Sequence, residues 1–180
     1  MLGPILRGEK ISLEPMRLED IDTFRDWLSD LEITRYLLVR FVPSRRQEEE
    51  WYDHAARNES SVHWSIVAGG TPIGNTGIHG IDWINRHATT GTIIGDREYW
   101  GKGYASEAVR LRTGYAFSEL GLERLETESL AENHAMHRVL EKSGYIRIGL
   151  RRRHVYRGGT WHDAILFELL RQDWLTRNPA

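Results

Sequence analysis

An abrupt change of hydrophobic period at a glycine-containing turn is the strongest restriction that this sequence places on its fold. Residues 89–94 are mostly β-branched, which favours a strand. From Ala105 to Leu120 the apolar residues instead recur every three or four positions and stop before Gly121, as in a helix that ends at a glycine. The sequence therefore predicts a strand, a turn at residues 100–104 and a long helix in direct succession.

The rest of the chain alternates between strand-like and helix-like patterns. Gly69-Gly70 and Gly158-Gly159 suit hairpin turns, because glycine adopts positive φ without steric cost. No linker or repeat interrupts the pattern, so residues 1–180 are predicted to form a single domain. The class is α+β, with a mixed, mostly antiparallel sheet flanked by about four helices. Strands are expected at residues 11–15, 62–68, 71–81, 124–130, 145–149 and 164–170, and the other helices at 18–31, 45–57 and 133–143.

Composition and charge exclude several classes of function. The 24 basic and 26 acidic residues leave a formal net charge of −2, so no global positive field points to nucleic acid or an anionic membrane. Without cysteine, the chain has no disulfide, no thiolate metal site and no cysteine nucleophile. It also lacks an apolar leader and a long apolar run. We therefore expect a cytoplasmic protein with no nucleic-acid or membrane partner.

The predicted turn has the features of an anion site. The first N–H groups of a helix are unpaired and point outward, and the helix dipole adds partial positive charge. Gly101 and Gly103 permit close approach of a ligand, and Lys102 adds a charge nearby. The phosphate-loop motif is absent, and Ser106 stands where a dinucleotide fingerprint needs its last glycine. A phosphate site of another kind and a plain strand-to-helix turn are the two interpretations.

Three motifs follow one another in a fixed order along nearly the whole chain. Trp-Gly-Lys-Gly-Tyr-Ala stands at residues 100–105. The pattern N-x-x-x-x-R-x-x-E-K-x-G-[FY] follows at Asn133, Arg138, Glu141, Lys142, Gly144 and Tyr145, and G-x-x-x-D at Gly159 and Asp163. In these motifs the sequence resembles the GNAT superfamily of acetyl-CoA-dependent N-acetyltransferases, in particular its RimJ/RimL-like branch.

This resemblance implies both the fold and the position of the cosubstrate. The two central strands should splay apart and open a V for acetyl-CoA. Backbone groups of Ile93, Ile94 and Gly95 should pair with the pantetheine amides, as an added strand does, and Asn133 should reach the pantetheine arm. The loop that is expected to hold the pyrophosphate consists of Trp100, Gly101, Lys102, Gly103, Tyr104, Ala105 and Ser106.

The family positions for a base and an acid are altered in this sequence. Where the family carries them, Thr89, Met136 and Leu140 stand here. His79 and Asp82 end the strand next to the expected V and are the substitute catalytic candidates, His79 because a pKa near 6.5 suits a base. Each also has a plain structural interpretation, as a hydrogen-bonded or surface residue.

Two other arrangements compete with these candidates. Glu126 and Glu128 lie on the neighbouring predicted strand, where a solvated face is the simpler interpretation. A chain of water molecules to the amine, with a backbone N–H near Ile94 holding the oxyanion, needs no side chain at all.

Two clusters of charged or metal-ligating residues stand apart from the motifs. His134 and His137 have a spacing that could share a metal, but no third ligand is suggested, so no metal is expected. An arginine-rich segment suits either an acidic ligand or a solvated edge strand. It contains Arg147, Arg151, Arg152, Arg153 and Arg157 and no acid.

The function predicted from these observations is acetyl transfer from acetyl-CoA to a primary amine. Direct attack in a ternary complex is expected, because no cysteine is present to carry the acyl group. The acceptor is a protein N-terminus or a small molecule, and the resemblance implies a homodimer. The alternatives are a non-catalytic acyl-CoA-binding module and a succinyl-CoA-using or antibiotic-modifying enzyme of the same fold.

Overall fold

The computed structural model describes residues 1–178, in which eight strands form one open sheet. Their spatial order is β1-β2-β3-β4-β5-β6-β8-β7, and each neighbouring pair is antiparallel except β5 and β6. The predicted α+β class is therefore confirmed. The strands are β1 (Leu6–Arg7), β2 (Ser12–Pro15), β3 (Val62–Ala68), β4 (Thr71–Asp82), β5 (His87–Ile94), β6 (Arg124–Leu130), β7 (Ile146–Arg157) and β8 (Thr160–Leu170).

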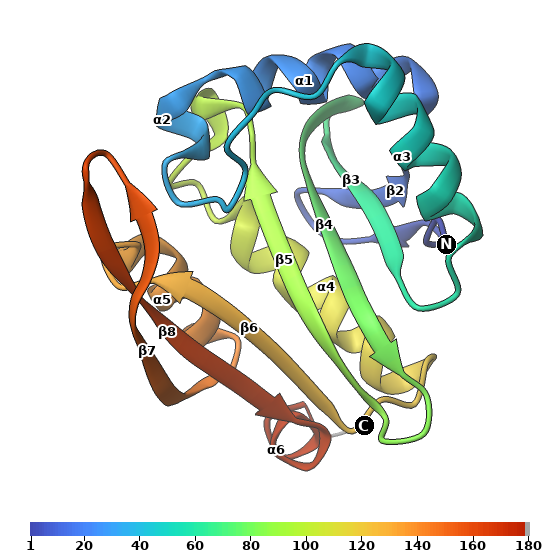
Figure 1. Cartoon of the computed structure of the whole chain (residues 1–180). Coiled ribbons are helices and arrows are strands. Elements are labelled where there is room, and N and C mark those ends of the chain that lie inside the picture. The colour runs from blue at the N-terminus through green and yellow to red at the C-terminus, as the bar shows by residue number, and fades with distance from the viewer. Residues whose placement is uncertain (179–180) are drawn as a thin grey trace.

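Helices cover both faces of the sheet (Figure 1). Helix α4 crosses behind β4 and β5, and α5 lies behind β8 in the same view, whereas α1, α2 and α3 border the upper part of the sheet. Residues 1–178 contain six α-helices, two more than expected, and none of them is both long and apolar enough to cross a membrane. The helices are α1 (Ile21–Ser29), α2 (Leu31–Thr34), α3 (Arg45–Arg57), α4 (Tyr104–Ser118), α5 (His134–Lys142) and α6 (Arg171–Arg177).

The parallel neighbours β5 and β6 stay paired over only three residues each. The register runs from His87 opposite Arg124 to Thr89 opposite Glu126 and then ends. Just beyond this point the Thr90 hydroxyl donates to the Glu126 carbonyl (3.2 Å), while the Thr127 hydroxyl donates to the Thr90 carbonyl (2.9 Å). The strands diverge above this vertex (Figure 1), which confirms the predicted V.

The core lies between α4 and the sheet. The apolar stripe of α4 runs from Ala108 to Phe117, both of which are 0% exposed, and it meets the sheet because its residues repeat with helical period. Trp64 on β3 is also fully buried there. The same helix buries two charged residues, Glu107 and Arg112, which no hydrophobic pattern predicts.

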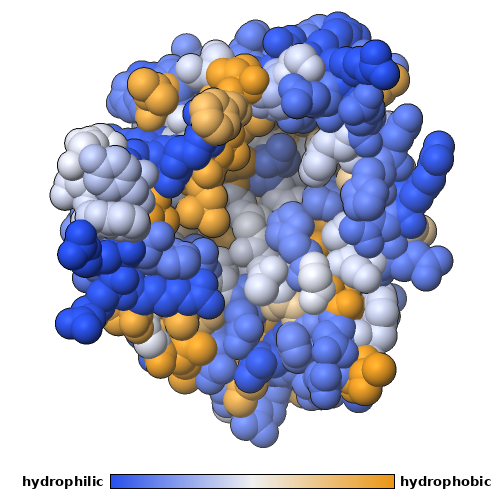
Figure 2. Space-filling model, in the orientation of Figure 1, coloured by the Kyte–Doolittle hydropathy of each residue, from blue (hydrophilic) through white to orange (hydrophobic). Residues whose placement is uncertain are grey.

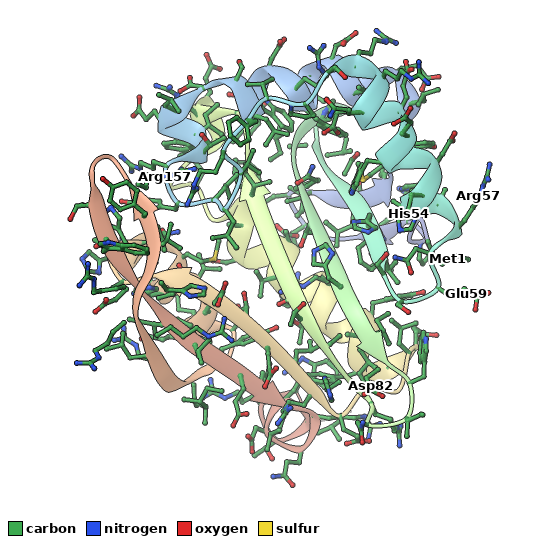
Figure 3. The ribbon with its side chains drawn as sticks, in the orientation of Figure 1. Met1, His54, Arg57, Glu59, Asp82 and Arg157 are labelled. Carbon is green, nitrogen blue, oxygen red and sulfur yellow. The ribbon has the colours of Figure 1, made fainter. Side chains whose placement is uncertain are left out.

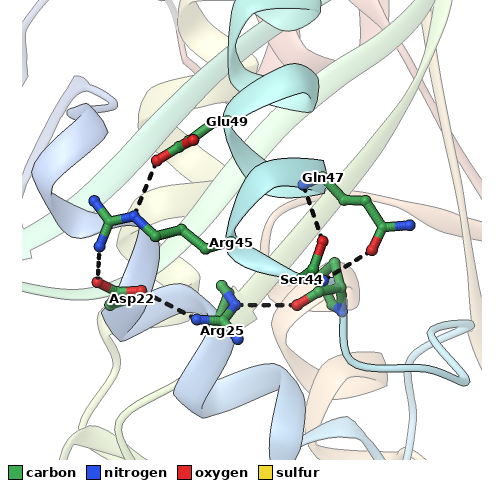
Figure 4. Close-up of polar contacts among 7 residues, drawn as sticks. Asp22, Arg25, Ser44, Arg45, Gln47 and Glu49 are labelled. Atoms are coloured by element: carbon green, nitrogen blue, oxygen red, sulfur yellow. Dashed lines mark hydrogen bonds and ion pairs between the residues drawn. The ribbon is translucent and has the colours of Figure 1, made fainter.

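A capping box sets the start of α3 (Figure 4). The Ser44 hydroxyl accepts a hydrogen bond from the Gln47 backbone, and the Gln47 side chain accepts one from the Ser44 backbone, which satisfies two otherwise unpaired donors. Arg45 in the next position bonds Asp22 of α1 and Glu49 of α3. These contacts tie α3 to α1 beside the upper end of the sheet.

The helix predicted over residues 18–31 is divided in the structure. A 3₁₀ turn at Leu18–Asp20 leads into α1, and the chain then becomes extended at Asp30 before α2 begins. The Asp30 side chain caps α2 and also pairs with Arg97, which in addition pairs with Glu32. A residue 67 positions away therefore stabilises this break, so a local pattern could not reveal it.

The last two strands are longer than predicted. Hydrophobic alternation indicated strands at residues 145–149 and 164–170, but β7 and β8 continue to the turn at Gly158-Gly159. The added half of β7 is charged because β7 is the exposed edge of the sheet. Polar side chains at a sheet edge oppose unwanted strand pairing.

Candidate functional site

A cavity of about 460 Å³ fills the V between β5 and β6. Its walls come from both strands, from α4 and α5 behind the sheet, and from a loop above it. Figure 2 shows the molecule hollowed on this face, with hydrophobic side chains bordering the hollow on its left. On β5 the lining residues are Thr89, Thr90, Gly91 and Thr92, and on β6 they run from Glu126 to Leu130.

The turn before α4 has the geometry of an anion site. Gly101 has φ +73° and Gly103 φ +91°, a left-handed conformation that favours glycine. Gly103 is the N-cap and provides no capping side chain, so the first N–H groups of α4, from Tyr104 to Ser106, remain for a ligand. A Cβ at Gly101 would meet nothing within 4 Å. The loop is therefore open where a pyrophosphate would approach.

Lys10 is a cation of this turn that the sequence did not indicate. Its Nζ lies 3.4 Å from the Lys102 carbonyl and 3.8 Å from the place of a Cβ on Gly103. The buried carboxylate of Glu107 holds the segment, because it accepts hydrogen bonds from the backbone N–H groups of Glu9 and Lys10. Lys10 is 92 positions from Lys102, and only folding brings the two together.

The backbone groups predicted to meet pantetheine are partly engaged within the chain. The Trp100 indole donates to the Ile94 carbonyl (2.8 Å), and the Gly95 N–H donates to the Ile73 carbonyl (2.9 Å). The Gly95 N–H is therefore engaged within the chain, and pairing of these backbone groups with pantetheine stays a prediction. Residues 89–92 of β5 line the cavity, whereas Ile93 lies against a smaller hollow on the α1 side.

Asn133 begins α5 and lines the cavity, as do two residues at the altered family positions. Its side-chain oxygen accepts a hydrogen bond from the Met136 N–H (3.2 Å), which confirms the predicted cap. Met136 and Leu140 lie one and two turns further along α5 and also face the cavity. They give this wall apolar surface in place of an acid.

His79 lies on the face of β4 opposite α4. A Cβ added to Gly77 would come within 2.7 Å of its ring, and one on Gly91 within 3.5 Å. The two glycines therefore leave the space that the imidazole occupies across β4 and β5. Burial lowers the pKa of His79, and the Arg112 guanidinium lowers it further. The imidazole is consequently neutral at pH 7, the form that accepts a proton.

His63 is the nearest aromatic neighbour of His79, with ring centroids 5.0 Å apart. Its side chain is bonded to the Ser61 hydroxyl (3.0 Å), and the residue is only 8% exposed. Burial first, and then His79 and the chain's amino group, lower the pKa of His63 to about 4. Two neighbouring imidazoles that are neutral at pH 7 thus lie on the face of β3 and β4 opposite α4, outside the lining of the cavity.

This shift predicts a loss of stability in mild acid. An unfolded chain protonates His63 near pH 6.5, whereas the folded chain does so only near pH 4. The free energy of unfolding should therefore fall as the pH is lowered from 6.5 to 4. Below pH 4, His63 is protonated in both states and should cause no further fall. In denaturant titrations, the fall in the free energy of unfolding over this pH range should be about 2–3 kcal/mol smaller in His63→Gln than in the unaltered chain. His54→Gln, at an exposed position of α3, should follow the unaltered chain, and an equal drop in all three would contradict this explanation.

Asp82 lies away from the cavity, at the lower end of the sheet (Figure 3). Its carboxylate accepts hydrogen bonds from the backbone N–H groups of Ile84 and Asn85 and from the Asn85 side chain. These bonds, led by the Asn85 N–H, hold the pKa of Asp82 below its usual value. This bonding stabilises the turn between β4 and β5, and it corrects the expectation that Asp82 stands next to the V.

The acidic residues of β6 face the cavity rather than bulk solvent alone. Glu126 pairs across the sheet with Thr89, which pairs with His79, so the three occupy one row. Glu128 forms ion pairs with Arg151 and with His154 (3.4 Å). The sequence favoured a solvated face for both glutamates because they alternate with Leu125 and Thr127, and this alternation does not show which face of the strand lines the V.

Two of the five arginines in the arginine-rich segment form ion pairs with glutamates of the chain. Arg151 pairs with Glu128, and Arg147 pairs with Glu141 (2.8 Å). The Arg153 backbone N–H donates to Asp163 (2.7 Å). The positive charge seen in the sequence is therefore balanced at Arg147 and Arg151, whereas the Arg157 guanidinium bonds neutral backbone carbonyls.

Residues 34–40, here called the crossing loop, close the wide end of the V. Arg157 near the tip of β7 donates to the carbonyls of Thr34 and Val39, and Arg40 donates to a carbonyl of β7 (3.3 Å). Figure 3 shows Arg157 between the hairpin and the loop. Three consecutive residues of the loop line the cavity: Tyr36, Leu37 and Leu38.

His134 and His137 make contacts within the fold. Their rings meet edge to face at 5.9 Å, and His137 bonds the Leu130 carbonyl (3.0 Å) from a buried position. Within residues 1–178 no group of three or more potential ligands could hold a metal ion. His137 therefore anchors α5 to β6.

Comparisons with known proteins agree with this geometry. The family model described as Acetyltransferase (GNAT) domain matches residues 10–146. An uncharacterized N-acetyltransferase, p20 of Bacillus licheniformis, is 31% identical over 94% of this chain and 97% of its own length. Spermidine N(1)-acetyltransferase of Escherichia coli K12 is 23% identical over 96% of this chain and 92% of its own. The solved spermidine N-acetyltransferase of Vibrio cholerae, in complex with CoA and spermine, has a TM-score of 0.88 at 20% identity and covers 93% of this chain and 99% of its own.

Proposed function

Because this chain belongs to the GNAT acetyltransferase family, we propose that it transfers the acetyl group of acetyl-CoA to a small-molecule primary amine by direct attack in a ternary complex. The observation that carries this proposal is that the anion-site turn and one wall of the V cavity belong to the same helix, α4. The turn ends at Gly103, and the cavity is lined further along the same helix by Val109 and Arg112. An elongated ligand with a phosphate at one end fits this arrangement.

In the proposed reaction a neutral amine nitrogen bonds to the thioester carbonyl carbon, and the carbon–sulfur bond then breaks with its electron pair on sulfur. The amine proton must leave during this sequence. We assign its removal to His79, directly or through one water, because the imidazole is neutral at pH 7 and lies across the strands that form one side of the V. Asp82 is not proposed to take part, because its carboxylate is engaged in a turn.

A small acceptor is proposed over a protein N-terminus because the crossing loop closes the wide end of the V. A protein N-terminus brings a chain of residues with it and needs an open groove, whereas the loop is tied to β7 through Arg157. The carboxylates of Glu126 and Glu128 line the cavity, and a positively charged amine would share them with their arginine partners, Arg124 and Arg151. The relatives named above include enzymes for spermidine, which supports this substrate class.

A carboxylated donor such as succinyl-CoA is the second candidate, and the contacts within the fold argue against it. Of the arginines on β7, Arg151 lines the cavity, and its guanidinium already pairs with Glu128 instead of being free for a donor carboxylate. The RimJ/RimL-like branch, the single domain over residues 1–180, a cytoplasmic location and a homodimer stay predictions.

Calorimetric titration with acetyl-CoA, and with succinyl-CoA in parallel, tests the proposal first. Micromolar binding of acetyl-CoA, with weaker binding of succinyl-CoA, is expected. Thiol release should then be measured with polyamines, with smaller amines and with peptides that carry a free N-terminus. Turnover with peptides alone would contradict the small acceptor, and binding without turnover on any amine would instead indicate a non-catalytic acyl-CoA-binding module.

Replacing His79 with glutamine should remove the acidic limb of the pH profile. Burial lowers the pKa of His79 below 6.5, so kcat/KM of the unaltered enzyme should fall only below that pH as the imidazole is protonated. In His79→Gln the limb should disappear and kcat should fall roughly 100-fold. Asp82→Asn is the control and should keep its turnover. An unchanged pH profile in His79→Gln would mean that water, and not His79, removes the amine proton.

A further inference from the structure

Arg112 on α4 is a fully buried cation without a carboxylate partner. The residue is 1% exposed, and within residues 1–178 no Asp or Glu forms an ion pair with it. Its Nη1 donates to the hydroxyls of Thr76 (2.9 Å) and Thr92 (2.7 Å) and to the Gly91 carbonyl (3.0 Å). Its Nε is buried and has no partner. All of these acceptors are neutral, so the charge of the guanidinium is not balanced.

An unbalanced buried charge is costly, and buried charges in proteins are ordinarily paired. A leucine at this position would fill the interior between α4 and the sheet without that cost. The cavity at the V supplies the missing explanation, because Arg112 is one of its lining residues. A group that becomes negative in the cavity would complete the pair.

The position of Arg112 along α4 identifies the part of the ligand that it meets. Arg112 lies eight residues after Tyr104, which is about 12 Å along the helix axis from the anion-site turn. A pantetheine arm has roughly the backbone length of an extended four-residue chain, on the order of 13 Å. With its phosphates at the turn, such an arm brings its sulfur to the level of Arg112.

We propose that Arg112 stabilises the negative charge that collects on the CoA sulfur when the thioester bond breaks. This inference rests on the proposed function, because it takes the V cavity as the acetyl-CoA site. When the amine has bonded to the carbonyl carbon and the carbon–sulfur bond breaks, the electron pair passes to sulfur. The guanidinium holds the resulting thiolate as an ion, and solvent protonates it on release. This arrangement needs no acid at Met136 or Leu140.

The surroundings of Arg112 support this role. The guanidinium depresses the pKa of His79 through the sheet, so its field reaches the reacting face. Protein surrounds the cavity on several sides, and two charges interact more strongly in such surroundings than in water. Thr76, Thr92 and Gly91 hold the guanidinium in one place, and the fixed charge requires no rearrangement during the reaction.

The ionisation of bound CoA tests this proposal without any amine. The ultraviolet absorbance of the thiolate should be followed against pH with free CoA and with CoA bound to the unaltered protein. We expect the pKa of the bound thiol to lie at least one unit below that of free CoA. A bound thiol that titrates like the free one would overturn the proposal, whereas failure of CoA to bind would overturn the proposed function itself.

Variants then separate charge from packing. In Arg112→Met the bound thiol should lose its tenfold or larger excess of thiolate, and kcat should fall more than acetyl-CoA affinity does. Arg112→Lys keeps a positive charge and should recover part of the thiolate. Tyr145→Phe removes the 3.5 Å contact to Nη2 without changing the charge and should titrate like the unaltered protein. Equal thiol titration in Arg112→Met and in the unaltered protein would contradict the role of the charge.

Discussion

Replacing Gly103 with aspartate is expected to weaken acetyl-CoA binding by about 100-fold or more. Gly103 is the N-cap of α4 with φ +91°, at the turn where the pyrophosphate is proposed to lie. An aspartate there adds a negative charge close to a negative ligand, and at about 4 Å two like charges repel by roughly 4 kcal/mol in a partly screened site. Isothermal calorimetry with acetyl-CoA measures the loss directly.

Gly103→Asn is the matched control for this experiment. Asparagine has nearly the shape of aspartate and tolerates a left-handed backbone, and Lys10 Nζ, 3.8 Å from the place of a Cβ, leaves room for it. We expect Gly103→Asn to lose no more than about tenfold in affinity, because only modest backbone strain remains. If a folded Gly103→Asp protein binds acetyl-CoA as tightly as the unaltered chain, the turn is not the pyrophosphate site.

Replacing Trp64 with alanine is expected to lower the free energy of unfolding by about 3–5 kcal/mol. Trp64 is fully buried on β3, and its indole N–H donates to the Pro4 carbonyl (2.9 Å). Its ring also meets Tyr115 edge to face at 5.3 Å, and it lies where a Cβ on Gly3 would otherwise project. Alanine would leave a cavity beside β3 and remove the indole partner of the Pro4 carbonyl. Urea titration followed by circular dichroism gives the difference.

Trp83→Ala provides the comparison for the core variant. Trp83 lies in the turn between β4 and β5 and is 50% exposed, so its removal should change the unfolding free energy by less than about 1 kcal/mol. Similar losses in the two variants would show that Trp64 does not hold the sheet together as described.

Local patterns predicted most of the elements, because each element is specified by residues close to one another. The Gly69-Gly70 turn, the helix after Gly103 and the cap at Asn133 all depend on contacts within a few positions, and the structure confirms all three. The V was expected from the family resemblance rather than from any hydrophobic period. In the structure, the V begins where the pairing of β5 with β6 ends, at Thr89 and Glu126.

The candidate site depended much more on distant contacts. Asp82 was expected near the V because it ends a strand. In the structure its carboxylate instead accepts hydrogen bonds from the backbone of the following turn. Lys10 and the crossing loop reach the cavity from segments whose sequence carries no sign of it. In the sequence Arg112 is one more charge on a helix, and only its burial against Thr76 and Thr92 makes it exceptional.

The sequence by itself determined the class of fold, the anion-site turn and the family that the chain belongs to, because short-range periods and contiguous motifs carry that information. The tertiary structure decided which groups share the cavity, since Thr89, Glu126 and Arg112 come from three elements that meet only in the folded protein. Charge balance was decided there as well. Arg147 and Arg151 of β7 pair with glutamates of α5 and β6, whereas Arg112 was buried among neutral partners.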